Sequence, residues 1–271
     1  IAEYVSHAFF RAQAGRPGPV VLALPEDMLR ARTTVNNLGR AVEIQSHPGK
    51  DDIVKLRDLI EKAEKPLAII GGSGWNKKAC ENFMTFAEKN KIPVCATFRC
   101  QDRFDNTHPS YCGDLGVGQN PELQKRVQNA DVLLVVGARL GEMSTEGYTL
   151  IDIPKPKQRM IHIHQGAEEL GWVYQPELAI NSGMKNIATA LNELSPFKVN
   201  WKKWTKAARD EYLKWTIPPS TPGDVQMGTI MTWLNENIDT DTIVCNGAGN
   251  FSSWANRFYR YRELGTLLGP T

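Results

Sequence analysis

The sequence has few cysteines and no paired cysteine motif. Its 271 residues include five cysteines, with no Cys-X-X-Cys pair and no zinc-ligand spacing. The odd number and wide spacing argue against a disulfide framework and favour a reducing compartment, so we expect a cytoplasmic protein. Cys95 and Cys245 fall within short apolar runs, and both are predicted to be small core residues.

Two further absences narrow the range of partners. No stretch approaches the roughly 18 consecutive apolar residues of a membrane helix, and the N-terminus has no signal-peptide pattern. The 32 basic and 30 acidic residues are scattered and give a net charge of +2. A nucleic-acid or membrane-surface binder concentrates positive charge on one face. We therefore expect neither nucleic acid nor membrane as a partner.

Catalytic constellations are missing as well. No Ser/His/Asp or Cys/His arrangement occurs. His162 and His164 alternate on a predicted strand, so both point to the same face, a spacing that could suit a metal. No third ligand is placed nearby in the sequence, and packed or hydrogen-bonded strand histidines are the favoured interpretation. We predict no catalytic residue and no metal ligand in this chain.

Short apolar runs alternate with helical patterns between residues 48 and 195. All-apolar strands with helical crossovers predict a doubly wound parallel sheet of five or six strands, covered on both faces. The expected fold class is therefore α/β, with a nucleotide-binding, Rossmann-type and DHS-like central domain. Residues 97–120 are predicted to form a long polar loop, which is more often functional than not. The expected strands are 67–70, 94–95, 132–136, 160–163 and 178–180, and the expected helices are 51–64, 77–90, 121–128 and 184–194.

The flanking segments carry partial α/β patterns. Residues 1–14 form an amphipathic helix, and Val20–Leu24 is predicted to be a buried strand. Trp201, Trp204 and Trp215 are interpreted as contacts between domains, because no basic groove accompanies them. Residues 223–261 are predicted to run loop, helix, strand and helix. Because a helix starts at residue 1 without a start signal, and the chain stops in an opening βα unit, we expect a piece of a longer protein.

Glycine-rich loops are the segments able to hold a ligand. In a parallel sheet, ligands sit at the carboxyl ends of strands, where glycine lets backbone amides approach a phosphate. The run at 71–74 is not a complete G-x-G-x-x-G, so a tight turn for helix packing is about as well supported as a phosphate cradle. Loops at 113–118, 137–141 and 246–250 have the same character. The candidate nucleotide-type residues are Gly71, Gly72, Ser73, Gly137, Ala138 and Arg139.

Three segments together resemble the thiamine-diphosphate-dependent 2-oxo-acid enzymes of the acetolactate synthase branch. Residues 15–27 (GRPGPVVLALPED) look like the end of that family's pyrimidine-binding domain. Residues 130–139 (ADVLLVVGAR) are similar to its central-domain signature, and residues 242–262 look like the start of its pyrophosphate-binding domain. Order and spacing agree over nearly the whole chain.

The resemblance implies a division of the chain and a set of cofactors. It implies 2-oxo-acid decarboxylation or carboligation with thiamine diphosphate and Mg²⁺ in a parent protein that is a homodimer or homotetramer. The family's activating glutamate and its GDG motif are absent from this sequence, so the chain itself is expected to be inactive. Only Gly249, Asn250 and Phe251 resemble a turn that touches the diphosphate, and the family usually has Gln-His at the last two positions. The division is 1–29 for the end of the pyrimidine domain, 30–47 for a linker, 48–195 for the central domain, 196–222 for a second linker and 223–271 for the start of the pyrophosphate domain.

The resemblance also raises FAD, which some relatives hold in the central domain. The flavin-binding branch has charged groups where this chain has Gly141, Met143, His164 and Ser182. Losing them removes charge-assisted hydrogen bonds, so we expect FAD to be absent. An empty domain, or the ADP portion of a coenzyme A, remains open. The rival interpretations are a stand-alone module that binds NAD, FAD or ADP, and an oxidoreductase domain of the same sheet class.

Overall fold

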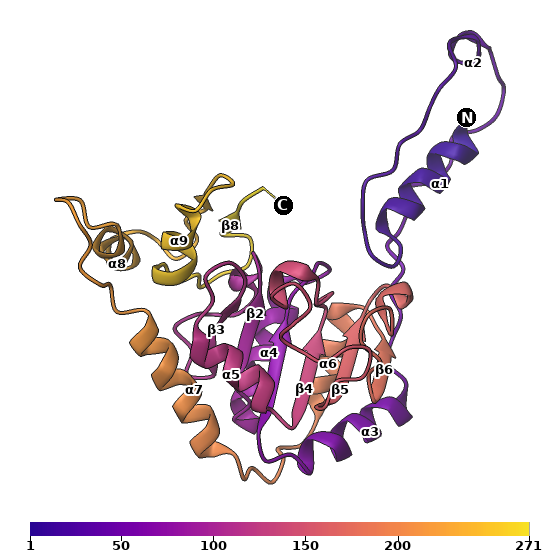
Figure 1. The fold of residues 1–271 in the computed structure, drawn as a ribbon. Coiled ribbons are helices and arrows are strands. Elements are labelled where there is room, and N and C mark those ends of the chain that lie inside the picture. The colour runs from indigo at the N-terminus through magenta and orange to yellow at the C-terminus, as the bar shows by residue number, and fades with distance from the viewer. Residues whose placement is uncertain (271) are drawn as a thin grey trace.

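A six-stranded parallel sheet forms the centre of the molecule (Figure 1). The computed structural model describes residues 1–270. The strand order is β3-β2-β1-β4-β5-β6 and every neighbouring pair is parallel. This confirms the expected doubly wound α/β fold. The strands are β1 (Pro66–Ile70), β2 (Val94–Thr97), β3 (Tyr111–Leu115), β4 (Val132–Val136), β5 (Arg159–His164) and β6 (Leu178–Asn181).

Both faces of the sheet are buried. Successive residues of each strand point to opposite faces, and each face packs in its own hydrophobic core. Ala68 and Ile70 pack with the helices α3, α4 and α6, while Leu67 and Ile69 pack with α5. In the centre, Ile69 pairs with Cys95 of β2 and with Val135 of β4. The helices are α3 (Lys50–Glu61), α4 (Lys77–Asn90), α5 (Pro121–Asn129) and α6 (Met184–Glu193), with short 3-10 turns at Gln101–Arg103, Glu142–Ser144 and Ala167–Glu169.

The edge strand β3 corrects the prediction of a continuous loop over residues 97–120. The pairing runs from Val94↔Tyr111 to Ala96↔Asp114, so β3 holds one extra residue there. Gly113 lies in this bulge with φ +116. A glycine and an aspartate interrupt the apolar run of this five-residue strand. The hydrophobic pattern of the sequence therefore does not indicate a strand here.

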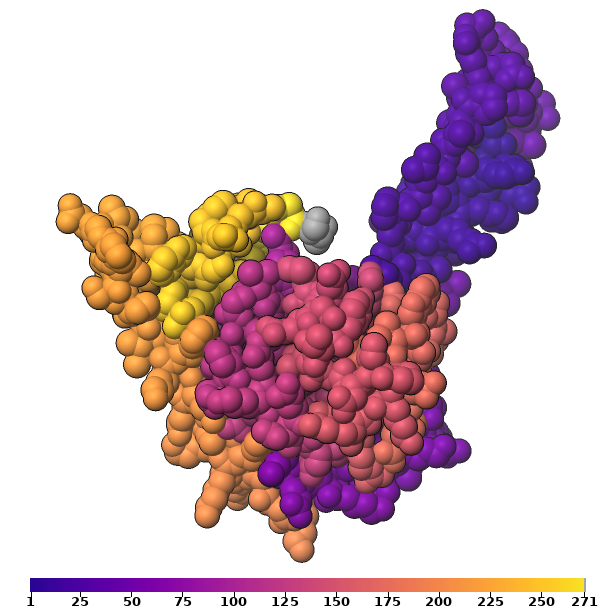
Figure 2. All heavy atoms as spheres, viewed as in Figure 1, coloured from indigo at the N-terminus to yellow at the C-terminus, as the bar shows by residue number. Residues whose placement is uncertain are grey.

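The N-terminal segment extends away from the body of the molecule (Figures 1 and 2). It contains α1 (Ala2–Gln13) and α2 (Glu26–Arg30), neither of which has a buried residue. The prediction of a buried strand at Val20–Leu24 is wrong: Val21 is 94% exposed, and within residues 1–270 no strand pairs with this run. An apolar run becomes a strand only where a neighbour satisfies its backbone N–H and C=O groups.

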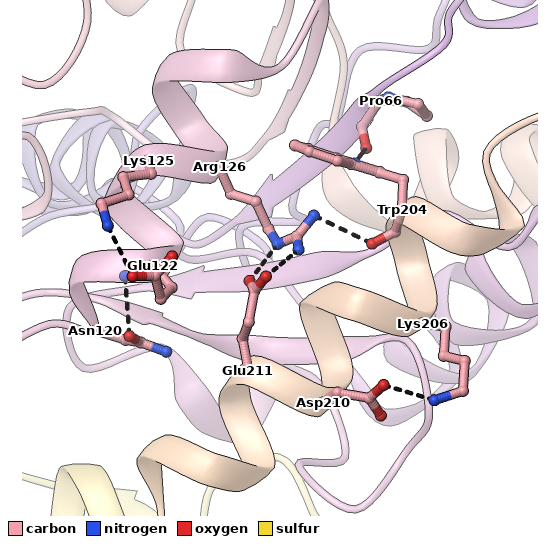
Figure 3. Close-up of polar contacts among 9 residues, drawn as sticks. All are labelled: Pro66, Asn120, Glu122, Lys125, Arg126, Trp204, Lys206, Asp210 and Glu211. Atoms are coloured by element: carbon pink, nitrogen blue, oxygen red, sulfur yellow. Dashed lines mark hydrogen bonds and ion pairs between the residues drawn. The ribbon is translucent and has the colours of Figure 1, made fainter.

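Helix α7 (Lys202–Trp215) leads from the sheet domain to the C-terminal segment. The Trp201 indole donates to the Asn90 carbonyl (3.0 Å). The Trp204 indole donates to the Pro66 carbonyl (2.9 Å), as Figure 3 shows. These two bonds fix the start of α7 against the sheet domain. Helix α7 lies within residues 196–222, which the sequence analysis assigned to a linker.

The C-terminal segment contains a small second sheet. Its elements are α8 (Met227–Asn237), β7 (Val244–Cys245), α9 (Ser252–Phe258) and β8 (Leu267–Leu268), with β7 and β8 paired in parallel. Cys245 is exposed, so its prediction as a core residue is wrong, whereas Cys95 is fully buried. Neither β7 nor β8 has a buried residue. No helix within residues 1–270 is both long and apolar enough to cross a bilayer.

Candidate functional site

The strand order reverses between β1 and β4, which makes their carboxyl ends the expected ligand position in this fold. The turns that follow the two strands touch each other. A Cβ added to Gly72 would lie 2.0 Å from the Gly137 carbonyl oxygen, and one added to Gly137 would lie 2.6 Å from the Gly71 oxygen. Gly72 and Gly137 both have positive φ, +68 and +74. Four of the predicted residues, Gly71, Gly72, Gly137 and Ala138, are thus brought together.

The chain's own side chains fill the space around the first turn. The Trp75 indole donates to the Gly71 carbonyl (2.8 Å), and the Gln165 amide donates to Ser73 Oγ (3.0 Å). A Cβ on Gly74 would lie 2.2 Å from Gln165 Oε1. The glycines in this arrangement allow close packing of two turns and a covering side chain, and they leave little space for a pyrophosphate. Trp75 and Gln165 were missed by sequence reasoning, because no local pattern shows which side chain covers a turn.

Arg139 lines a neighbouring cavity of about 300 Å³. Arg16 from the N-terminal segment reaches the same cavity and forms an ion pair with Glu169 (2.7 Å). Arg139 Nε lies 3.9 Å from the other oxygen of Glu169. Two arginines therefore share one carboxylate, and Glu168 also lines the cavity, so its two positive charges are matched by two negative ones.

His162 also lines this cavity and is neutral. Its Nε2 lies 2.9 Å from the Ala138 carbonyl, which only accepts, so Nε2 carries the proton and Nδ1 is an acceptor. Within residues 1–270, the buried Nδ1 has no hydrogen-bond partner. Burial lowers the pKa of His162 to about 4. His162 Nδ1 is thus an unprotonated and buried ring nitrogen at neutral pH.

The two strand histidines face the same side, as predicted. Their ring centroids are 6.3 Å apart, and His164 Nδ1 accepts from the Gly166 amide (3.0 Å). Among the described residues, no group of three or more His, Cys, Asp or Glu side chains could hold a metal ion.

The residues at the four altered positions fit a flavin poorly. His164 and Ser182 are buried, and the Ser182 hydroxyl donates to the Gly183 carbonyl (3.2 Å). Met143 is 49% exposed and apolar, and Gly141 has no side chain. None of them supplies a carboxylate to bind the hydroxyls of a ribose.

Gly249, Asn250 and Phe251 lie in an exposed loop before α9, apart from the switch-point turns. Phe251 folds over this loop, since a Cβ on Gly249 would lie 2.7 Å from its ring. The loop supplies backbone groups and the Asn250 amide, but no carboxylate for Mg²⁺. The structure therefore separates the predicted site residues into two groups.

Comparison with known proteins relates this chain to one family. Residues 53–191 match the family described as "Thiamine pyrophosphate enzyme, central domain". The acetolactate synthase large subunit of Corynebacterium glutamicum is 26% identical, with 99% of this chain and 44% of that protein aligned. Isozyme 2 of Escherichia coli K12 is 25% identical over 93% of this chain and 45% of its own length. Acetolactate synthase 1, chloroplastic, of Nicotiana tabacum is 23% identical over 97% and 40%. The chain spans less than half the length of these relatives.

Proposed function

Because this chain belongs to the thiamine pyrophosphate enzyme family, with the central domain within residues 53–191, we propose that it serves in a 2-oxo-acid enzyme of the acetolactate synthase type. The observation that carries this proposal is the alignment of relatives with that name along 93–99% of the chain. The reaction would be decarboxylation, carboligation or both, in the transferase or lyase class. The protein would be a homodimer or homotetramer in the cytoplasm.

The proposed domain division assigns residues 48–195 to the scaffold. It assigns 1–29 to the end of a pyrimidine-binding domain and 223–271 to the start of a pyrophosphate-binding domain, with linkers at 30–47 and 196–222. Two features support the division: the sheet lies between Pro66 and Asn181, and α1 and α2 stand apart from it.

Thiamine diphosphate with Mg²⁺ is the proposed cofactor, and it would supply the carbon nucleophile and the electron sink. Of this chain, Gly249, Asn250 and Phe251 would form part of the diphosphate wall. The residues of the chain would otherwise position domains and contribute no proton-transfer group.

The isolated 271-residue chain is expected to show no turnover of pyruvate with thiamine diphosphate and Mg²⁺. No GDG motif and no activating glutamate of the family occur in it, so neither the metal nor the cofactor ring would be held. The measurement is CO₂ release and acetolactate formation, with the Corynebacterium glutamicum large subunit assayed in parallel. Product above the buffer blank in the isolated chain would refute the prediction.

The purified chain is expected to be colourless. Each missing charge-assisted hydrogen bond forgoes about 1.5–3 kcal/mol, and two such losses weaken binding by roughly two to four decades. The measurement is the visible absorbance of oxidised flavin after gel filtration.

The same sample tests the rival functions. A flavin band that survives gel filtration contradicts the absence of FAD. Release of NAD or an adenine nucleotide on denaturation would favour a nucleotide-binding module.

A further inference from the structure

A second cavity of about 260 Å³ lies far from the switch point, between the edge strand β3, helix α7 and helix α9. Val117, Tyr212 and Trp215 supply apolar and aromatic wall, and Asp114 and Arg257 supply the charged groups. The volume equals that of roughly nine water molecules in the liquid. It suits a compact organic molecule, smaller than a nucleotide.

Asp114 carries an unpaired negative charge on this wall. One of its carboxylate oxygens accepts a hydrogen bond from the Gln101 amide (3.2 Å), and no cation contributes to its environment. Asp114 is partly buried, and a carboxylate partly removed from water without a cationic partner is stabilised when a cationic ligand compensates it.

Arg257 carries an unpaired positive charge on the opposite element, α9. Its Nε donates to the Trp215 carbonyl (2.9 Å), and its guanidinium lies 3.5 Å from the centre of the Trp215 ring. Burial lowers the pKa of Arg257 and no carboxylate opposes this shift. Stacking on Trp215 fixes the plane of the guanidinium, so its remaining N–H groups are preorganised for a carboxylate.

Two amides on the same wall have unused acceptors. The side-chain oxygens of Gln119 and Asn256 are buried and accept no hydrogen bond within residues 1–270. The Gln119 side chain is held from its other end, where Nε2 donates to Glu146 (2.7 Å). Because both oxygens have almost no accessible surface, a ligand in the cavity does not reach them, and Asp114 is the acceptor that this wall offers.

We propose that this cavity binds a small zwitterion with an apolar body, of the α-amino acid class. Its ammonium group pairs with Asp114, its carboxylate pairs with Arg257, and its apolar chain lies against Val117 and Trp215. Asp114 and Arg257 do not pair with each other, so one molecule with both charges satisfies both.

Three probes of equal chain length separate the two charges. L-norleucine carries both, L-norleucinamide carries only the ammonium, and hexanoate carries only the carboxylate. In calorimetric titrations of the 271-residue chain at pH 8, norleucine should bind in the millimolar range or tighter, and each single-charge probe about tenfold to a hundredfold more weakly. Absence of norleucine binding at millimolar concentration, or equal binding of all three probes, overturns the proposal.

Two substitutions assign the charges. Asp114→Asn should weaken norleucine about tenfold or more while sparing hexanoate. Arg257→Gln should weaken norleucine similarly while sparing norleucinamide. The ratio between probes is the readout, so a partial loss of stability does not imitate the result. Asp58→Asn and Arg159→Gln, exposed positions outside the cavity, are the matched controls, and unchanged ratios in both cavity variants contradict the proposal.

The pH dependence of norleucine affinity is an independent test of the role of Asp114. Burial raises the pKa of Asp114 to about 7, so its charge is lost as pH falls through 7. Norleucine affinity should therefore fall on acidification, while hexanoate affinity should not. Four groups with a pKa raised by burial face Asp114: Cys95, Tyr111, Tyr212 and Tyr261. The charged groups near these four are Asp102, Arg209 and Arg260. The raised pKa values keep Cys95 and the three tyrosines neutral near pH 7. A flat norleucine profile between pH 6 and 8 contradicts the assignment to Asp114.

Discussion

Replacing Gly72 by alanine is expected to lower the free energy of unfolding by about 2–5 kcal/mol. Two effects add at this position. The φ of +68 strains any residue with a Cβ, and the Cβ would lie 2.0 Å from the Gly137 carbonyl oxygen. Backbone cannot move aside as a flexible side chain can, so the turns after β1 and β4 would be forced apart at the centre of the sheet. Urea denaturation of the chain measures the loss.

Gly147→Ala is the matched control for this experiment. Gly147 has φ +64, yet nothing lies within 4 Å of an added Cβ. Its replacement should cost only the conformational strain, about 1–2 kcal/mol. Equal losses at both positions would show that the contact between the turns contributes nothing.

Arg126→Met is expected to cost about 2–4 kcal/mol, the second large effect. The Arg126 side chain is only 6% exposed and binds both oxygens of Glu211, through Nε at 2.7 Å and Nη2 at 2.6 Å (Figure 3). It also donates to the Trp204 carbonyl (3.1 Å) and stacks 4.1 Å from the centre of the Trp204 ring. Its removal leaves the Glu211 carboxylate without a cation, and it weakens the attachment of α7 to α5.

The Lys206–Asp210 pair on the same helix is the control, because Lys206 is 77% exposed (Figure 3). Lys206→Met should change stability by less than about 0.5 kcal/mol. A double-mutant cycle with Arg126→Met and Glu211→Gln isolates the pair itself. Additive effects of these two substitutions would contradict a strong coupling between Arg126 and Glu211.

The central sheet could be predicted because its inner strands are simple. β1 and β4 are buried at every position, so their sequences are continuous apolar runs. The helices between them have amphipathic patterns, and α4 begins and ends at the predicted residues. Edge strand β3 could not be predicted, since it pairs on one side only and accommodates Gly113 and Asp114 in its bulge.

The candidate site was less accessible to sequence reasoning. The glycines of the two turns could be found from the strand pattern, but their contact depends on the spatial order of two strands whose paired residues are 66 positions apart. Periodicity equally could not show that Val20–Leu24 finds no partner strand in the described residues. The charges of Asp114 and Arg257 come from distant segments, and no local signal connects them.

The strand order also has a consequence for synthesis on the ribosome. β1, β2 and β3 come from one continuous stretch and β4, β5 and β6 from the next, and within the sheet the two halves are joined by the pairing of β1 with β4. About 66 residues separate Ile70 from Val136, so at roughly 5–20 residues per second the apolar edge of β1 waits about 3–13 seconds for its neighbour. During that interval the nascent chain displays an open strand edge, the kind of surface that recruits other strands. The β1 residues, which lie at the centre of the finished sheet, are therefore the ones that a chaperone would have to shield first.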